Sequence, residues 1–200
     1  MKISVSSRVF DEDISELYPY TNFHPHSEFF RMKNGNHYML IAHIAKQFPQ
    51  GTRFVDIGTF LGYSALALSI NRGGHVVSYD LYDVREILPN DGKTLTVCDV
   101  PNVELLAKNC LDDIETLLSS PFIVLDVDPH DGKQEVEIIT RLIENGYKGI
   151  VLCDDIHLNS GMKDFWNWVP LKKLDATHYG HWSGSGIIVF DPSSYDVAME

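Results

Sequence analysis

The chain has 200 residues, of which 44% are hydrophobic and 22% are charged. This length suits one α/β domain, and the composition is that of a folded globular protein, unlike that of a disordered chain. The 28 acidic side chains outnumber the 16 basic ones and give a net charge of −12. This charge argues against a nucleic-acid backbone or an anionic membrane as the main partner.

The three cysteines are widely spaced and form no CxxC pair. We therefore expect reduced thiols and neither a zinc centre nor a redox centre. No segment approaches the roughly 18 consecutive apolar residues that a membrane helix needs, and the first residues lack the apolar stretch of a signal peptide. The sequence thus predicts a cytoplasmic protein without a membrane partner.

Residues 1–34 combine an acidic patch with the aromatic, histidine and proline residues of YPYTNFHPHSEFF. The prolines disfavour a long helix, so we expect an irregular arm or lid ahead of one domain that spans residues 35–200. His24 and His26 are either part of a substrate cover or of an exposed turn. Helical spacing of apolar residues then predicts a helix from 34 to 48.

The segment FVDIGTFLGYSALAL, residues 54–68, predicts a buried strand, a tight turn and the start of a helix. Glycines at the turn let the backbone approach a ligand, and the first N–H groups of the helix face the same crevice. A second strand, HVVSYD, ends in Asp80 about 24 residues beyond Asp56. An acid at about this spacing suits hydrogen bonding to ribose hydroxyls.

Strands and helices alternate through the rest of the chain. A polar segment from 81 to 101 takes the place of a crossover helix, and the remaining predicted elements are a strand at 102–108, a helix at 111–120, a strand from 121, a helix at 135–145, a strand at 148–158, a helix at 162–169 and a hairpin within 171–191. This order predicts a doubly wound, mostly parallel, seven-stranded Rossmann-like sheet with one antiparallel strand in the C-terminal hairpin. Its ligand edge should be acidic, because six aspartates follow or end the strands: Asp56, Asp80, Asp126, Asp128, Asp154 and Asp155.

Five segments in this order resemble the class I S-adenosylmethionine-dependent methyltransferases: VDIGTFLGYSALAL, VVSYD, LDVDPHDG, VLCDDIH and HYGHWSGSGIIVF. The resemblance is closest to the small O-methyltransferases of the catechol, caffeoyl-CoA and macrolide-sugar groups. It covers residues 35–191 and implies methyl transfer from S-adenosylmethionine to an oxygen of a small hydroxylated acceptor.

The resemblance also implies which residues contact the cofactor. The assigned positions are Asp56, Gly58, Thr59, Tyr63, Ser64, Asp80, Asn109, Cys110 and Asp126. Within this set, Asp80 holds the ribose hydroxyls, and Asn109 with Cys110 falls where the family contacts adenine. Without a ligand, the glycines would only form a tight turn and Asp80 would cap a helix.

By the same resemblance, Asp126, Asp154 and Asp155 correspond to the oxygen ligands of a divalent-metal site. Oxygen ligands suit Mg²⁺, Mn²⁺ or Ca²⁺ better than zinc. The alternative is that these carboxylates are solvated or cap the following helices.

The lysine that serves as base in the catechol-type enzymes is replaced here by Pro129. His130 and His157 are the candidates to substitute for it, since imidazole titrates near neutral pH. Near the C-terminus, strand alternation predicts His178 and Trp182 on one face and His181 on the other.

Two other functions stay open. One is a degenerate cofactor-binding protein without turnover, because the usual lysine and a crossover helix are missing. The other is a nicotinamide-dependent oxidoreductase, which the absence of a GxGxxG motif disfavours. The acceptor and the oligomeric state, a homodimer included, are not determined by the sequence.

Overall fold

The computed structural model describes residues 1–33 and 36–200. Its main sheet has seven strands: β2 (Arg53–Ile57), β3 (His75–Asp80), β4 (Val103–Ala107), β5 (Phe122–Leu125), β6 (Ile150–Asp154), β7 (Lys172–Asp175) and β8 (Ser185–Val189). The strand order is β4-β3-β2-β5-β6-β8-β7. Strand β8 is antiparallel to both neighbours and every other pair is parallel, so the predicted fold class is confirmed.

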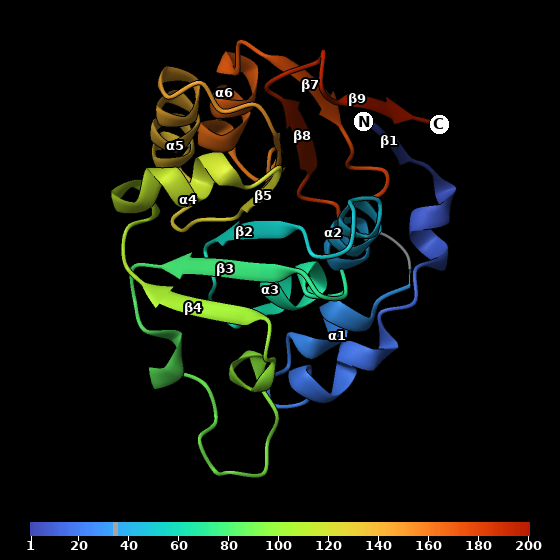
Figure 1. Ribbon diagram of the computed structural model, residues 1–200, viewed down its shortest axis with the longest axis vertical. Helices are drawn as coiled ribbons and strands as arrows, with labels where there is room; N and C mark the ends of the chain where they lie inside the picture. The colour runs from blue at the N-terminus through green and yellow to red at the C-terminus, as the bar shows by residue number, and fades with distance from the viewer. Residues whose placement is uncertain (34–35) are drawn as a thin grey trace.

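Helices cover both faces of this sheet (Figure 1). Helices α2 (His37–Lys46) and α3 (Tyr63–Leu68) pack on one face, and α4 (Ile114–Ser119), α5 (Lys133–Glu144) and α6 (Ser160–Trp168) pack on the other. Successive strand residues point to opposite faces. Phe54 and Phe122 therefore join the first core, while Val55 and Ile123 join the second. The central strands need nearly continuous apolar sequences because the sheet is buried on both sides.

The connection between β3 and β4 has no α-helix, as the polar segment 81–101 predicts. All of its residues are described, and they form two short 3-10 turns, Val84–Glu86 and Val97–Asp99. Between these turns the chain runs out as the long green loop at the bottom of Figure 1. The chain therefore crosses from β3 to β4 without an α-helix.

The first 33 residues pack against the main core. Strand β1 (Lys2–Val5) pairs in parallel with β9 (Asp196–Met199) in a separate two-stranded sheet that brings the two chain ends together (Figure 1). The segment also contains 3-10 helices at Ser7–Asp11 and Ser15–Thr21 and the short helix α1 (Ser27–Arg31). Ile3, Val5 and Phe30 are fully buried in the same core as α2 and α3. The sequence analysis did not predict β1 or β9, each only four residues long.

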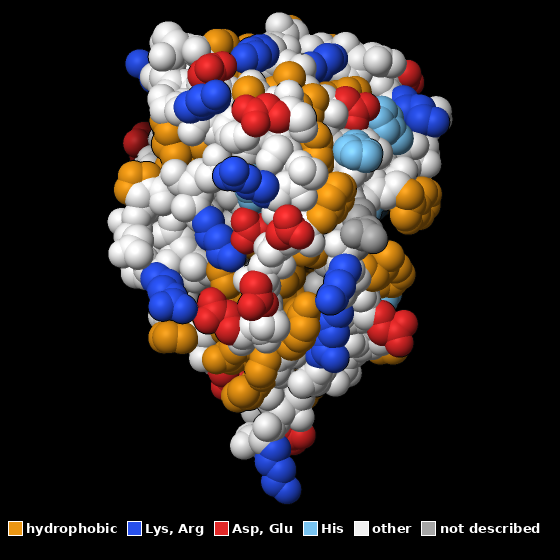
Figure 2. Space-filling model, turned by 90° about the vertical axis from the view of Figure 1, so that its right-hand side faces the viewer, with side chains coloured by type: hydrophobic (Ala, Val, Ile, Leu, Met, Phe, Trp, Pro, Cys, Tyr) orange, Lys and Arg blue, Asp and Glu red, His pale blue; other side chains and the backbone are white. Residues whose placement is uncertain are grey.

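Charged side chains of both signs are interspersed with hydrophobic ones on the face shown in Figure 2. Among residues 1–33 and 36–200, the helices are all too short or too polar to cross a lipid bilayer.

Candidate functional site

A cavity of about 1100 Å³ lies beyond the carboxyl ends of the parallel strands. This edge is where doubly wound sheets bind their ligands. Eight of the predicted site residues line the cavity: Gly58, Asp80, Asn109, Cys110, Asp126, His130, Asp154 and Asp155. From the N-terminal segment, His26, Phe29 and Met32 line it as well, whereas His24 does not.

Gly58 directly follows β2, at a turn that lines the cavity. Its φ is +97°, a value that residues with a side chain rarely adopt. A Cβ atom added at Gly58 would lie 1.6 Å from the backbone carbonyl oxygen of Asp126. The ends of β2 and β5 therefore touch through their backbones, and only glycine permits this approach.

The Asp80 carboxylate lies at the end of β3 and is oriented by two backbone groups. Its Oδ2 accepts the N–H of Phe60 at 3.0 Å, and its Oδ1 accepts the N–H of Tyr82 at 3.1 Å. Each carboxylate oxygen keeps a second lone pair. Asp80 can therefore accept further hydrogen bonds from a ligand without losing its position.

Asn109 and Cys110 follow β4 and begin a short 3-10 helix. The Asn109 side chain accepts the N–H of Leu111 at 2.9 Å and caps that helix. Burial raises the pKa of the Cys110 thiol to about 12. Cys110 is thus a neutral, unreactive part of the cavity wall.

Asp56, Thr59 and Ser64 form a buried polar group behind the cavity wall, and none of them lines it. The Ser78 hydroxyl donates to Asp56 Oδ2 at 2.6 Å and lies 2.6 Å from the Thr59 hydroxyl. Asp56 lies within β2 and is fully buried, not at the acidic edge where the sequence analysis placed it. Burial raises the pKa of Asp56 to about 7, although hydrogen bonds from Ser78 and Ser64 oppose the rise. Cofactor contact by Asp56, Thr59 and Ser64 stays a prediction.

Tyr63 also lies outside the cavity lining, and its ring is 3% exposed. The ring packs against those of Phe23, Phe30 and Tyr38, with centroids 5.4 to 6.2 Å apart. Its hydroxyl donates to the carbonyl of Thr21 at 3.2 Å. Tyr63 therefore fastens the N-terminal segment to α3, and its predicted contact with the cofactor is untested.

The three acids predicted to bind one metal divide into two clusters. Asp126 and Asp155 lie with His130, and one ligand atom from each of the three lies within 4.8 Å of the others. His130 Nε2 is 3.7 Å from Asp155 Oδ2, and His130 Nδ1 is 4.0 Å from Asp126 Oδ1. Burial and the nearby charges of Asp154 and Asp155 raise the pKa of Asp126 well above its usual value. The first cluster, Asp126, His130 and Asp155, thus holds carboxyl groups whose ionisation is opposed by burial and by neighbouring carboxylates.

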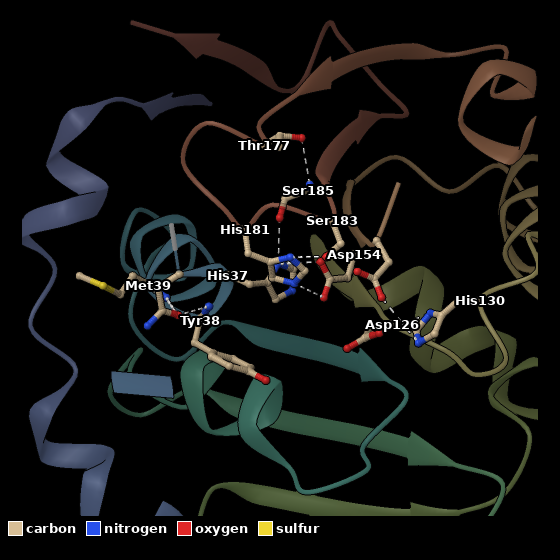
Figure 3. A network of polar contacts seen from close by, with 12 residues as sticks. His37, Tyr38, Met39, Asp126, His130, Asp154, Thr177, His181, Ser183 and Ser185 are labelled. Carbon is tan, nitrogen blue, oxygen red and sulfur yellow. Dashed lines mark hydrogen bonds and ion pairs between the residues drawn. The ribbon is translucent and has the colours of Figure 1, made fainter. Parts of the chain in front are cut away.

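Asp154 turns instead toward two histidines (Figure 3). His181 Nε2 lies 3.0 Å from Asp154 Oδ2, and His37 Nδ1 lies 3.3 Å from Asp154 Oδ1. Two serines hold the rings, with Ser183 Oγ 2.5 Å from His181 Nδ1 and Ser185 Oγ 3.1 Å from His37 Nδ1. All three members of this second cluster line the cavity.

The surroundings of the second cluster shift the pKa values of its three residues in different directions. Burial raises the pKa of Asp154, but His37 and His181 outweigh burial, and the net pKa lies below the ordinary value. Burial lowers the pKa of His37 to about 4, so this ring is neutral near neutral pH. Burial lowers the pKa of His181 as well, but the hydrogen bond that its ring donates to Asp154 and the charges of Asp154 and Asp155 outweigh burial and raise that pKa.

The other predicted histidines lie elsewhere. His157 Nε2 contacts Asp175 Oδ2 at 2.7 Å and does not line the cavity. His178 packs against the rings of Phe10 and Tyr179. The predicted division of faces is wrong for this segment, because His181 and Trp182 both line the cavity. The reason is that residues 176–184 form a loop between β7 and β8, where strand alternation does not apply.

His37 is the site residue that the sequence analysis missed. It begins α2, is 3% exposed and sits beside the apolar residues that define the helix pattern. A buried histidine in such a stripe has no sequence feature that distinguishes it from a core residue.

Solved structures with similar folds include methyltransferases in complex with S-adenosylmethionine or S-adenosylhomocysteine. A methyltransferase of Podospora anserina, PaMTH1, bound to S-adenosylhomocysteine, matches with a TM-score of 0.58 and 18% identity over 88% of this chain and 86% of that one. The O-methyltransferase TomG of Streptomyces achromogenes, in complex with S-adenosylmethionine, matches with a TM-score of 0.58 and 18% identity over 89% and 90%.

An O-methyltransferase of Bacillus cereus in complex with S-adenosylhomocysteine matches with a TM-score of 0.51 and 16% identity, over 91% of this chain and 89% of that one. This chain has the class I methyltransferase fold. No protein-family profile and no curated protein sequence matches it. The chain therefore shares the methyltransferase fold with these proteins at low sequence identity.

Proposed function

We propose that the protein transfers a methyl group from S-adenosylmethionine to an oxygen of a small hydroxylated acceptor. The observation that carries this proposal is the cavity of about 1100 Å³ at the switch in strand order, with Gly58 and Asp80 at the ends of neighbouring strands. A glycine turn after one strand and an acid at the end of the next are features with which doubly wound sheets bind nucleotide-like ligands, and they support this proposal. The cavity also has room for an acceptor beside the donor.

Different residues of the chain would bind the donor and line the acceptor space. S-adenosylmethionine, when bound, supplies an electrophilic methyl group that an acceptor oxygen attacks in line. The Gly58 turn gives the donor close access to the backbone, and Asp80 accepts hydrogen bonds from its ribose. Phe29 and Met32 add apolar side chains of the N-terminal segment to the cavity lining, where an acceptor would pack.

His130 is the residue that we propose takes the acceptor's proton. It lines the cavity, and its Nε2 lies 3.3 Å from Asp128 Oδ1 and 3.7 Å from Asp155 Oδ2. These carboxylates stabilise the positive charge that the ring gains on taking up a proton. His157 is less suited to this role, because it is paired with Asp175 outside the cavity lining.

The first cluster fits a divalent cation such as Mg²⁺, Mn²⁺ or Ca²⁺. Asp126 and Asp155 offer oxygen ligands with His130 beside them. Burial and then the charges of Asp154 and Asp155 raise the pKa of Asp126, and a cation would offset both effects. Such an ion would chelate acceptor oxygens and lower the pKa of the reacting hydroxyl.

Donor binding is tested with Asp80→Ala. We expect the wild-type protein to bind S-adenosylhomocysteine and the variant to bind it at least tenfold more weakly, because the ribose loses its charged acceptor. Isothermal titration calorimetry measures both affinities. Asp164→Ala, which removes an exposed acid from α6, is the matched control and should bind like wild type. If NADH binds and S-adenosylhomocysteine does not, the oxidoreductase alternative replaces this proposal.

Cation dependence is tested with Asp155→Ala. We expect this variant to keep its affinity for S-adenosylhomocysteine while methyl transfer falls at least a hundredfold, because the loss of a charged ligand weakens the binding of the cation directly. Methylation of a panel of hydroxylated acceptors is followed by mass spectrometry with Mg²⁺ and with a chelator. Equal loss of donor binding and turnover would contradict the division of roles between Asp80 and Asp155. Donor binding without turnover of any acceptor favours the degenerate alternative.

A further inference from the structure

The second cluster joins three parts of the fold that are far apart in the sequence. His37 comes from the start of α2, Asp154 from the end of β6, and His181 from the loop between β7 and β8. His37 and Asp154 are 3% and 7% exposed, and the side chain of His181 is 26% exposed. All three residues line the cavity, and His181 is the most exposed of them.

Two buried polar atoms in this cluster have no hydrogen-bond partner. They are Asp154 Oδ1 and His37 Nε2. Asp154 Oδ1 lies only 3.3 Å from His37 Nδ1, yet the two atoms do not form a hydrogen bond, and His37 Nδ1 instead contacts the Ser185 hydroxyl. A buried carboxylate oxygen without a partner costs about 1–3 kcal/mol or more. Asp154 therefore directs an unpaired oxygen into a group of nitrogen ligands.

The spacing of these atoms matches a coordination shell. Bonds of about 2.0–2.2 Å from a metal to nitrogen and oxygen place neighbouring ligand atoms roughly 3.0–3.5 Å apart in tetrahedral or octahedral geometry. His181 Nε2 is 3.0 Å from Asp154 Oδ2 and His37 Nδ1 is 3.3 Å from Asp154 Oδ1, so these spacings fit a shell in which the carboxylate uses both oxygens. One ligand atom from each of the three residues lies within 4.8 Å of the others.

The serine beside His181 supports the same conclusion. Ser183 Oγ lies 2.5 Å from His181 Nδ1, so Nδ1–H can donate to the serine once an ion takes the place of the proton on Nε2. Histidines that bind metals are commonly fixed in this way by a polar group on the other nitrogen. Figure 3 shows Ser183 beside His181 and Ser185 above His37.

We propose that His37, Asp154 and His181 bind a divalent first-row transition metal ion. Two imidazole nitrogens and one carboxylate suit ions such as Mn²⁺, Co²⁺ or Zn²⁺, whereas Mg²⁺ and Ca²⁺ prefer oxygen alone. Three protein ligands leave further coordination positions open, and all three residues line the cavity. The site is separate from the first cluster and does not depend on the proposed methyl transfer.

The test is a titration of the metal-free, purified protein with Co²⁺, followed by visible absorption. With millimolar Mg²⁺ present to occupy the oxygen ligands of the first cluster, we expect one Co²⁺ per chain with the spectrum of nitrogen ligation, displaced by Zn²⁺. His37→Gln and His181→Gln should each weaken Co²⁺ binding at least tenfold, because each removes one ligand. Ser183→Ala should weaken it by about tenfold through the loss of the group that fixes His181.

His130→Gln is the matched control, since it makes the same change in the first cluster. We expect it to leave the Co²⁺ spectrum unchanged. Circular dichroism checks that each variant is folded, and if His37→Gln is not, His181→Gln and Ser183→Ala decide the outcome. Failure of Co²⁺ to bind, or loss of binding in His130→Gln with retention in His181→Gln, overturns the proposal. The titration contains neither S-adenosylmethionine nor an acceptor, so its result is independent of the donor-binding test.

Discussion

Gly58→Ala is expected to cost the protein more than about 4 kcal/mol of folding free energy, in the range of the most damaging single substitutions. The added methyl group would lie 1.6 Å from the Asp126 carbonyl oxygen and 2.6 Å from its carbonyl carbon. Neither atom can rotate away, because both belong to the backbone at the end of β5. The positive φ at Gly58 adds about 1–2 kcal/mol of strain.

Urea denaturation of wild type and variant measures this loss. Gly92→Ala is the matched control, because Gly92 also has a positive φ, +68°, but has no atom within 4 Å of the added Cβ. The control should lose only about 1–2 kcal/mol, which is the cost of the backbone conformation alone. Similar losses in the two variants would show that β2 and β5 are not in close contact at Gly58.

If Gly58→Ala stays folded, its cavity should be altered as well. The clash can be relieved only by moving β2 from β5, and this movement displaces Asp126 from its neighbours. We therefore expect weaker binding of S-adenosylhomocysteine by the folded fraction, measured by calorimetry. Gly92→Ala should bind it like wild type.

Local patterns predicted most of the fold. The buried strands are short apolar runs with alternating faces, and each of the later helices follows one of them at a polar or glycine-containing turn. The absent crossover helix between β3 and β4 was visible in the polar sequence of 81–101. The pair of β1 and β9 was not predicted, since the partners stand at opposite ends of the chain and no local pattern specifies a pairing over that distance.

The candidate site was predicted less completely than the fold. Position along the chain placed Asp80, Asp126, Asp154 and Asp155 at one edge of the sheet, because parallel strands end on the same side. It could not predict which way each side chain turns. Adjacent residues Asp154 and Asp155 join different clusters, and that choice depends on His37, which reaches Asp154 from α2.

Some residues predicted to contact the cofactor are buried in the protein and do not line the cavity. Tyr63 and Thr59 follow the glycine turn in sequence, yet their side chains point into the protein, where Tyr63 meets three aromatic rings and Thr59 meets Ser78. A helix of six residues after Gly62 presents several sides to the core, and every residue of it is buried. Proximity to the turn in sequence is therefore a weak guide to contact with a ligand.

Asp56→Asn is expected to make the protein more stable than wild type at alkaline pH. The pKa of Asp56 is about 7 in the folded protein against an ordinary value of 3.8, a rise of about 3 units caused first by burial. Between these pH values the folded state binds more protons than the unfolded state, so stability falls as the pH rises. At about 1.4 kcal/mol per unit, the loss reaches roughly 4 kcal/mol once the pH exceeds the folded pKa.

Asparagine does not titrate, and its side-chain oxygen can still accept the hydrogen bond from Ser78. The measurement is the free energy of unfolding in urea at pH 5.5 and pH 8.5 for wild type and variant. From pH 5.5 to the folded pKa of about 7, wild type should lose about 2 kcal/mol relative to Asp56→Asn. Because other groups titrate equally in both proteins, the difference between them isolates Asp56. Asp164→Asn, at an exposed position, should show no such pH-dependent difference, and an equally flat result for Asp56→Asn would mean that Asp56 is charged in the folded core.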